Sequence, residues 1–158
     1  MIFAFISYIL SKGIVITSHD DFNRHLSIIN GGKIVRMLST SSKLIENGND
    51  EFTIRHGLTK ISQDNLNICG KLFDSGVVPC VDQNERIRFR FKDIGENNVN
   101  IVSDDGLCLT RKSIDKKTDG NYLNLSKCAD TENQKFKVFI IVTTRDANMD
   151  MTYELANI

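Results

Sequence analysis

The feature that most constrains the fold of this chain is a weak internal repeat. Two short phrases alternate along the sequence. The first phrase is anchored at Ile34, Cys69 and Cys108, and the second at Leu44, Cys80 and Cys128. Successive anchors are 35 and 39 residues apart in the first phrase and 36 and 48 apart in the second. Because the anchors stay in step apart from one longer loop at 113–120, we interpret the chain as three units of about forty residues.

Each unit consists of short segments rich in β-branched and aromatic residues. Val99–Val102, Tyr122–Leu125 and Phe136–Phe139 alternate apolar and polar side chains, which is typical of half-buried strands. Asn-Gly and Asp-Gly pairs, as at 30–31 and 105–106, mark tight turns between such segments. No window keeps a helical stripe of apolar residues. We therefore predict an all-β fold with roughly twelve short strands closed into a barrel.

Composition and charge exclude several classes of protein. The 158 residues make about one domain, and 20 Lys and Arg balance 20 Asp and Glu. A neutral chain lacks the basic excess that drives non-specific binding to nucleic acid, so no nucleic-acid partner is predicted. With 41% hydrophobic and 25% charged residues the chain is also not a disordered one.

The two ends of the chain differ from its centre. Ile2–Leu10 is an apolar run too short for a membrane-spanning helix, which needs about 20 residues, but long enough for the core of a signal peptide. No Lys or Arg precedes it. We predict a signal peptide over 1–18, a secreted domain over 19–142 without a membrane span, and a loose polar C-terminal tail over 143–158. The alternative for the first segment is a buried N-terminal strand.

Four cysteines in a chain with a predicted signal peptide indicate a disulfide framework. Cys69 and Cys80 are the two anchors of the second unit, and Cys108 and Cys128 are those of the third. The first unit has an apolar pair at the same anchors, as expected if each bridge lies within one unit. We therefore predict the pairs Cys69–Cys80 and Cys108–Cys128. A Cys₄ zinc site is the alternative, but no Cys-x₂-Cys spacing occurs, so no metal is predicted.

The third unit carries the clearest motifs: Gly106-Leu-Cys108-Leu, Gly120-Asn-Tyr-Leu-Asn-Leu125, Cys128 and Asn133-Gln-Lys-Phe136. The last of these looks like a Gln-x-Trp signature with Phe in place of Trp. With these motifs and the repeat, the chain from about 20 to 141 resembles the ricin B-type β-trefoil lectins. The resemblance implies a β-trefoil, in which three four-stranded units pack around a pseudo-threefold axis.

In that family, one shallow pocket per unit can hold a sugar such as galactose. An Asp two residues after the first Cys, an aromatic residue before the second Cys, and a final Asn and Gln form the pocket. In the third unit Asn133 and Gln134 match the Asn and Gln, whereas Thr110 and Ser126 replace the Asp and the aromatic residue. Lys71 replaces the Asp in the second unit.

The resemblance thus implies a degenerate carbohydrate site, best preserved in the third unit. The predicted sugar-binding residues are Asn133, Gln134, Asn124, Asp105 and Tyr122. Two of them have structural alternatives, because Gln134 can simply hydrogen-bond a turn and the strand alternation can bury Tyr122 in the core.

The function implied is that of a secreted lectin-like protein that binds glycans or glycoproteins of a cell surface or wall. No cofactor is predicted. The chain has no nucleophile elbow, no phosphate-binding Gly-rich loop and no Cys/His catalytic signature, so we predict no enzyme activity. The missing Asp and aromatic residue favour the alternative, a structural or protein-interaction trefoil of an extracellular coat or wall. Trefoil protease inhibitors and cytokines lack this register of Cys and Gln-x-aromatic motifs.

One further segment, Arg86–Lys92, interleaves basic and aromatic residues, as single-strand nucleic-acid binders do. Strand alternation produces the same pattern with arginines outside and apolar groups inside, and we favour this interpretation. The repeat places Phe52, Phe89 and Phe136 at equivalent positions, and we predict them in the core.

Overall fold

Thirteen strands and one 3₁₀ helix, η1, make up the described part of the computed structural model, which covers residues 9–29, 31–39, 57–63, 66–71, 74–81, 87–144 and 151–155. The strands are β1 (Ile9–Ser18), β2 (Arg24–Ile29), β3 (Ile34–Ser39), β4 (Thr59–Lys60), β5 (Ser62–Gln63), β6 (Leu66–Gly70), β7 (Val77–Cys80), β8 (Arg88–Gly95), β9 (Asn98–Ser103), β10 (Leu107–Asp115), β11 (Gly120–Lys127), β12 (Phe136–Thr144) and β13 (Met151–Leu155). The helix η1 spans Glu132–Gln134. The all-β prediction is confirmed.

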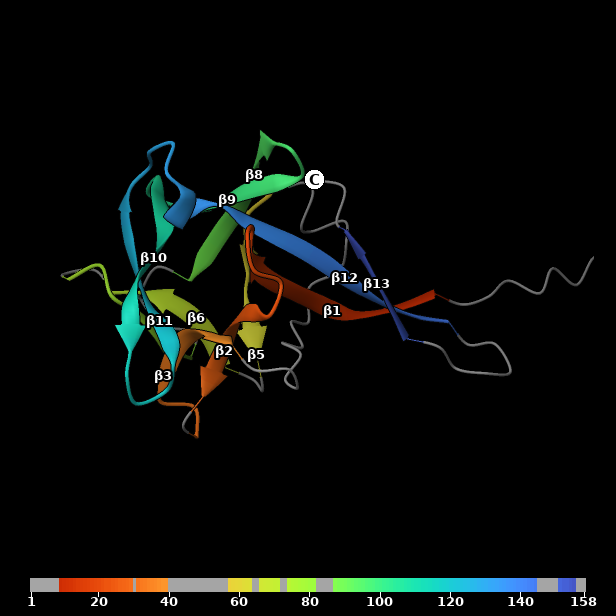
Figure 1. Cartoon of the computed structure of the whole chain (residues 1–158), viewed down its shortest axis with the longest axis horizontal. Helices are drawn as coiled ribbons and strands as arrows, with labels where there is room; N and C mark the ends of the chain where they lie inside the picture. The colour runs from red at the N-terminus through yellow and green to blue at the C-terminus, as the bar shows by residue number, and fades with distance from the viewer. Residues whose placement is uncertain are drawn as a thin grey trace, which may run out of the picture.

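The main sheet closes on itself (Figure 1). Its ten strands run in the order β13-β12-β1-β2-β3-β11-β10-β9-β8-β4, and β12 also pairs with β9 through Phe136 and Val99. Strands β5, β6 and β7 form a separate three-stranded sheet. Because the β12–β9 contact joins the two ends of a run of paired strands, the prediction of a closed sheet is confirmed.

No helix in these described ranges is long and apolar enough to cross a membrane.

Three antiparallel meanders follow the same plan: β1–β2–β3, β5–β6–β7 and β9–β10–β11. Between the first and second strands of each meander, Thr17 faces His25, Ser62 faces Asn67 (and Gln63 faces Leu66), and Val102 faces Cys108. The fully buried Ile16, Ile61 and Ile101 stand one residue before Thr17, Ser62 and Val102, which aligns these three pairs. His25, Asn67 and Cys108 therefore occupy corresponding positions. The phrase alignment had matched Cys108 with Ile34, which lies on β3, and with Cys69, which lies two residues beyond Asn67.

The register of the predicted repeat is therefore wrong, although three similar sets of strands exist. The connections between the first and second strands span 19–23, 64–65 and 104–106, so they differ in length. Matching short phrases cannot allow for such differences. Leu44, the other anchor of the first unit, lies outside the described residues.

The hydrophobic core takes side chains from all three meanders. Phe89 and Phe136 are completely buried, which confirms their predicted place in the core, whereas Phe52 lies outside the described residues. The other large, fully buried side chains are Ile14, Ile16, Leu26, Met37, Ile61, Ile68, Ile101 and Leu109. On β8, Phe89 and Phe91 are buried while the intervening Arg88 and Arg90 are exposed, so the predicted alternation is confirmed for this strand.

Both predicted disulfide pairs are present. Cys69–Cys80 joins β6 to β7, with Cα atoms 6.0 Å apart, and Cys108–Cys128 joins β10 to the residue after β11, with Cα atoms 5.0 Å apart. Each bridge closes one hairpin, and the paired positions are 11 and 20 residues apart in the sequence. Loops of this size are stabilised by about 3 kcal/mol per bridge in the chain-entropy model.

The N-terminal strand β1 is part of the barrel. It pairs with β12 along its whole length, from Ile9 opposite Thr144 to Ser18 opposite Phe136. Ile14 and Ile16 on this strand are completely buried. The second half of the predicted signal peptide, residues 9–18, thus forms a strand of the barrel, as in the alternative interpretation of a buried N-terminal strand. Residues 1–8 lie outside the described residues. A cut at residue 18 would remove β1, whereas a cut before residue 14 would leave its buried part in place.

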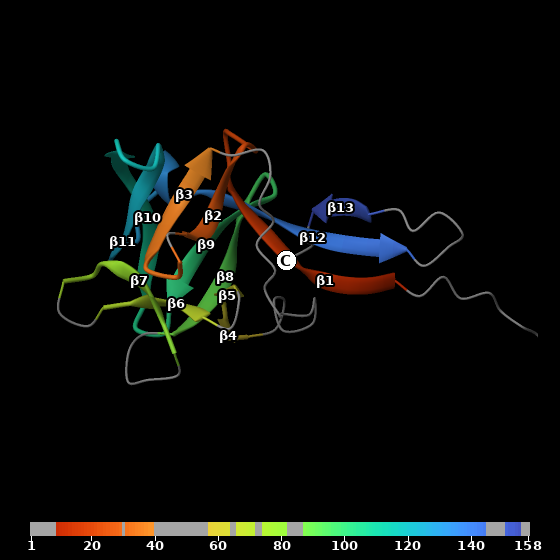
Figure 2. The same cartoon turned by 90° about the horizontal axis from the view of Figure 1, so that it is seen from below.

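Part of the predicted loose C-terminal tail forms strands. β12 continues to Thr144, and β13 returns antiparallel to it, with Leu155 opposite Phe139 and Met151 opposite Thr143. The sequence of β13, Met-Thr-Tyr-Glu-Leu, alternates apolar and polar residues as a strand does. Figures 1 and 2 show β13 and the outer parts of β1 and β12 extending to one side of the remaining strands.

The burial of β1 can be tested by substituting Ile16 in the full chain. Ile16→Ala leaves a cavity in the core, so we expect the free energy of unfolding to fall by about 2–5 kcal/mol, against about 0.5–1.5 kcal/mol for Ile16→Val. Urea denaturation of the three proteins measures both differences. Equal stability of all three would show that β1 does not contribute to the core.

Candidate functional site

The predicted sugar-binding residues lie around η1, β10 and β11, and Gln134 is at their centre. Gln134 is 3% exposed. Its Oε1 accepts a hydrogen bond from the Ala129 amide at 2.8 Å, and its Nε2 donates to Thr110 Oγ1 at 3.1 Å and to the Lys127 carbonyl at 3.0 Å. The Gln134 carbonyl accepts a further bond from Asn100 Nδ2 at 2.9 Å. Gln134 therefore fastens η1 to β9, to β10 and to the end of β11.

The sequence resemblance matches Thr110 and Ser126 to the lectin family's Asp and aromatic residue. Their hydroxyl oxygens are 2.5 Å apart, across the β10–β11 ladder. Thr110 is 3% exposed, and its hydroxyl contacts the Cys108 carbonyl at 3.0 Å as well as Gln134. The hydrogen bond that the resemblance implies between the Gln and the Asp is thus made to a threonine, inside the protein.

Asn133 and Asp105 are both exposed, on η1 and on the turn between β9 and β10. Asn133 Oδ1 accepts a hydrogen bond from Thr131 Oγ1 at 2.6 Å, and its Nδ2 forms no hydrogen bond among the described residues. Asp105 Oδ1 accepts one from Ser103 Oγ at 2.5 Å. Asn133 can therefore donate to a ligand at the surface without breaking a contact.

The other two predicted residues, Asn124 and Tyr122, lie on one face of β11. Asn124 is half-buried opposite Thr110 and next to Gly76, and its Oδ1 is buried without a hydrogen-bond partner among the described residues. Tyr122 is 41% exposed, so the alternative of core burial is wrong. The Arg36 guanidinium lies over the Tyr122 ring, with Cζ 4.3 Å from its centroid.

The structure thus brings Gln134 and Asn124 together around Thr110, with Asn133 on the exposed side of η1. Asp105 is held by Ser103 at the β9–β10 turn, and Tyr122 belongs to a separate contact with Arg36.

That contact includes a buried carboxylate. Asp115 is 6% exposed, and its Oδ2 accepts a hydrogen bond from Arg36 Nε at 3.1 Å. Its Oδ1 accepts one from the Lys117 amide at 3.0 Å. The Lys117 hydrogen bond first, and then the Arg36 guanidinium, hold the pKa of Asp115 below its ordinary value.

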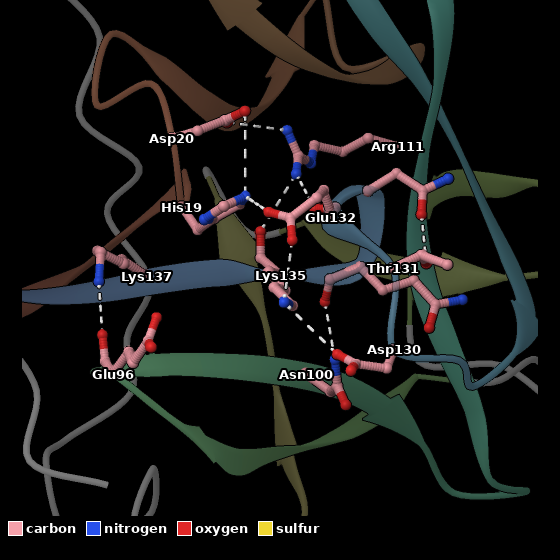
Figure 3. Close-up of polar contacts among 12 residues, drawn as sticks. His19, Asp20, Glu96, Asn100, Arg111, Asp130, Thr131, Glu132, Lys135 and Lys137 are labelled. Carbon is pink, nitrogen blue, oxygen red and sulfur yellow. Dashed lines mark hydrogen bonds and ion pairs between the residues drawn. The ribbon is translucent and has the colours of Figure 1, made fainter.

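A charged cluster beside η1, formed by His19, Asp20, Arg111, Glu132 and Lys135, was missed by the sequence analysis (Figure 3). Arg111 lies at its base, with 11% of its side chain exposed. Its Nη2 donates to the carbonyls of Glu132 and Lys135, and its Nη1 lies 3.4 Å from Asp20 Oδ1. Burial lowers the pKa of Arg111 from its ordinary value, but the guanidinium remains charged near neutral pH.

Glu132 links the other members of the charged cluster (Figure 3). Its two carboxylate oxygens lie 2.5 Å from His19 Nε2 and 3.0 Å from Lys135 Nζ. The hydrogen bond from Lys135 to Glu132 raises the pKa of the Lys135 ammonium. These contacts tie the β1–β2 turn to η1. The contact between His19 and Glu132 joins residues 113 positions apart, which no local sequence pattern can reveal.

Within the described ranges, no group of three or more His, Cys, Asp and Glu side chains is arranged to hold a metal ion.

Comparisons with known proteins bear on the fold. No protein-family model matches the chain, and no curated protein matches it. A search of solved structures finds similarity to one titled "Crystal structure of designed 3-fold symmetric protein, ThreeFoil", with a TM-score of 0.61 and 15% sequence identity. The match covers 79% of this chain and 96% of that chain. At this identity the likeness speaks for the fold alone, and together with the closed sheet it supports a β-trefoil.

The different roles of neighbouring residues on η1 can be tested by stability. Gln134→Ala leaves buried backbone groups without partners, so we expect the free energy of unfolding to fall by about 1–3 kcal/mol. Asn133→Ala removes an exposed side chain and should change it by less than about 0.5 kcal/mol. Urea denaturation measures both values. Equal effects of the two substitutions would contradict the bracing role of Gln134.

The buried Asp115 predicts a dependence of stability on pH. Because its pKa is lower in the folded than in the unfolded protein, its carboxylate stabilises the fold above about pH 4, and this contribution is lost as the pH falls through the folded-state pKa. Asp115→Asn should therefore melt at a lower temperature than the parent near neutral pH, with the difference shrinking below about pH 4. Thermal melts across this range test it, and a difference independent of pH would contradict the assignment.

Proposed function

We propose that this chain is a secreted, non-enzymatic, lectin-like protein of the ricin B type, with a degenerate carbohydrate site in its third repeat. The observation that carries the proposal is the hydrogen bond from Gln134 Nε2 to Thr110 Oγ1. In the lectin family the corresponding Gln supports the sugar-binding Asp. Here the same relation is kept between the same two positions, although the Asp has become Thr.

Sugar contacts in such a site would come from exposed amide groups. Asn133 Nδ2 is the best placed, because the other side-chain atom of this amide, Oδ1, already accepts a hydrogen bond from Thr131. The stacking position holds Ser126, so the ligand gains no contact with an aromatic face there. Binding of a single sugar should therefore be weak, and useful avidity would need several sites or several glycans on one surface.

The proposed location and partners are an extracellular space and the glycans or glycoproteins of a cell surface or wall. Two disulfides support this location, because such bridges persist in oxidising compartments.

A second candidate, a structural or protein-interaction trefoil, is favoured by a different observation. The Thr110 hydroxyl is buried and contacts both Gln134 and Ser126, so the group at the family's Asp position is already engaged within the protein. In this case the Gln134 contacts serve the fold alone.

A glycan array probed with the oxidised, multivalently displayed protein separates the two candidates. We expect binding that free sugar competes away, and a loss of at least about tenfold in Asn133→Ala, which corresponds to one good hydrogen bond. Asn23→Ala, which changes an exposed Asn on the β1–β2 turn, is the matched control and should bind like the parent.

A blank array from protein that melts cooperatively would exclude the lectin proposal and favour the second candidate. Binding that Asn133→Ala leaves intact would place the sugar elsewhere.

A further inference from the structure

A strip of basic side chains lies on the outer face of β8 and β4. We define the basic strip as Lys60, Arg88, Arg90 and Lys92. The three residues on β8 are exposed, whereas the phenylalanines between them are buried. Lys60 lies directly opposite Arg88 in the β4–β8 ladder. The strip therefore gathers four positive charges on one face of a chain whose net charge is zero.

The cations of β8 have no carboxylate partner within the described part of the chain. Arg88, Arg90 and Lys92 form no ion pair there, whereas the half-buried arginines Arg24, Arg36 and Arg111 each have one. The nearest acidic positions along the chain are Glu85, three residues before Arg88, and Asp93, next to Lys92. Glu85 lies outside the described residues. An anion can therefore bind the three cations of β8 without displacing a partner among the described residues.

The strip is fixed in shape by the core beneath it. Phe89 is completely buried and Phe91 is 5% exposed, and β8 pairs with β9 from Phe89 to Gly95. Alternate residues on a strand are about 6.6 Å apart, so Arg88, Arg90 and Lys92 span about 13 Å in a nearly straight row. Such a row matches an extended polymer that carries anionic groups at regular intervals.

The strip also lies beside the candidate carbohydrate site around η1. Lys92 faces Asn100 in the β8–β9 ladder, and the Asn100 side chain donates to the carbonyl of Gln134 on η1. Figure 1 shows β8 and β9 side by side. A chain molecule bound along the strip would therefore run close to the exposed side of η1.

We propose that the basic strip binds an anionic polysaccharide, one that carries sulfate or carboxylate groups along an extended chain. Arg guanidinium groups suit such oxyanions because they donate two parallel hydrogen bonds. Single-stranded nucleic acid fits less well, since its binders stack bases on exposed aromatic rings, and the rings of Phe89 and Phe91 face the core. The two disulfides also point to an oxidising compartment.

This site does not depend on the proposed sugar pocket, because it uses other side chains and charge rather than neutral hydroxyl recognition. The Asn133→Ala variant should bind the polyanion like the parent, so failure of one proposal can be told from failure of the other.

The test measures the affinity of the full chain for a fluorescent heparin-type sulfated oligosaccharide at several salt concentrations. Replacing Arg88, Arg90 and Lys92 together by Gln should weaken binding at least about tenfold and flatten the dependence on salt, because fewer counterions are released. The matched control replaces Lys112, Lys116 and Lys117 by Gln, three exposed cations on the β10–β11 hairpin. This control lowers the net charge equally and should bind within about twofold of the parent.

Three results would overturn the proposal. The first is failure of the parent protein to bind the oligosaccharide at low salt. The second is an equal loss of affinity in both triple variants, which would indicate an effect of net charge alone. The third is tighter binding of a single-stranded oligonucleotide of similar charge density, which would assign the strip to nucleic acid. A thermal melt of each variant excludes unfolding as the cause of any loss.

Discussion

The closed sheet depends on the double pairing of β12. This strand pairs with β1 from Ile9 to Ser18, with one bulge between Ser11 and Gly13, and it pairs with β9 where Phe136 faces Val99. Phe136 is completely buried at this junction, and Arg111 lies over its ring, 5.5 Å from the centroid. The residues just before β12 form η1, so the contacts of Gln134 and Glu132 fix the chain next to the same junction. Barrel closure and the candidate site thus share one short segment.

Much of the fold follows from local chemistry. Alternating residues predict strands such as β8, and two cysteines within each of the second and third units predict both bridges. The register of the repeat does not follow, because turns of different length shift the phrases relative to the strands, and only hydrogen-bond ladders show that His25 and Asn67 correspond to Cys108. The N-terminal run shows the same ambiguity, since short apolar segments suit either a leader or a core strand.

The candidate site was predictable to a smaller degree. A sequence motif identifies Asn133 and Gln134, but only burial separates them into an exposed amide and an internal brace. The charged cluster depends on His19, Arg111 and Glu132 meeting across the fold, and its members have no spacing in common. The basic strip is intermediate: its alternation is visible in the sequence, whereas the position of Lys60 opposite Arg88 comes from the sheet.

The distribution of the two disulfides makes the three meanders unequal. The β6–β7 and β10–β11 hairpins are cross-linked, whereas the β2–β3 hairpin contains no cysteine. As long as the bridges remain oxidised, the β2–β3 hairpin should therefore need less free energy to open than the other two hairpins. Its backbone amides should exchange with solvent faster. Reduction would remove this difference, so the redox state of the surroundings sets the order in which the parts of the barrel open.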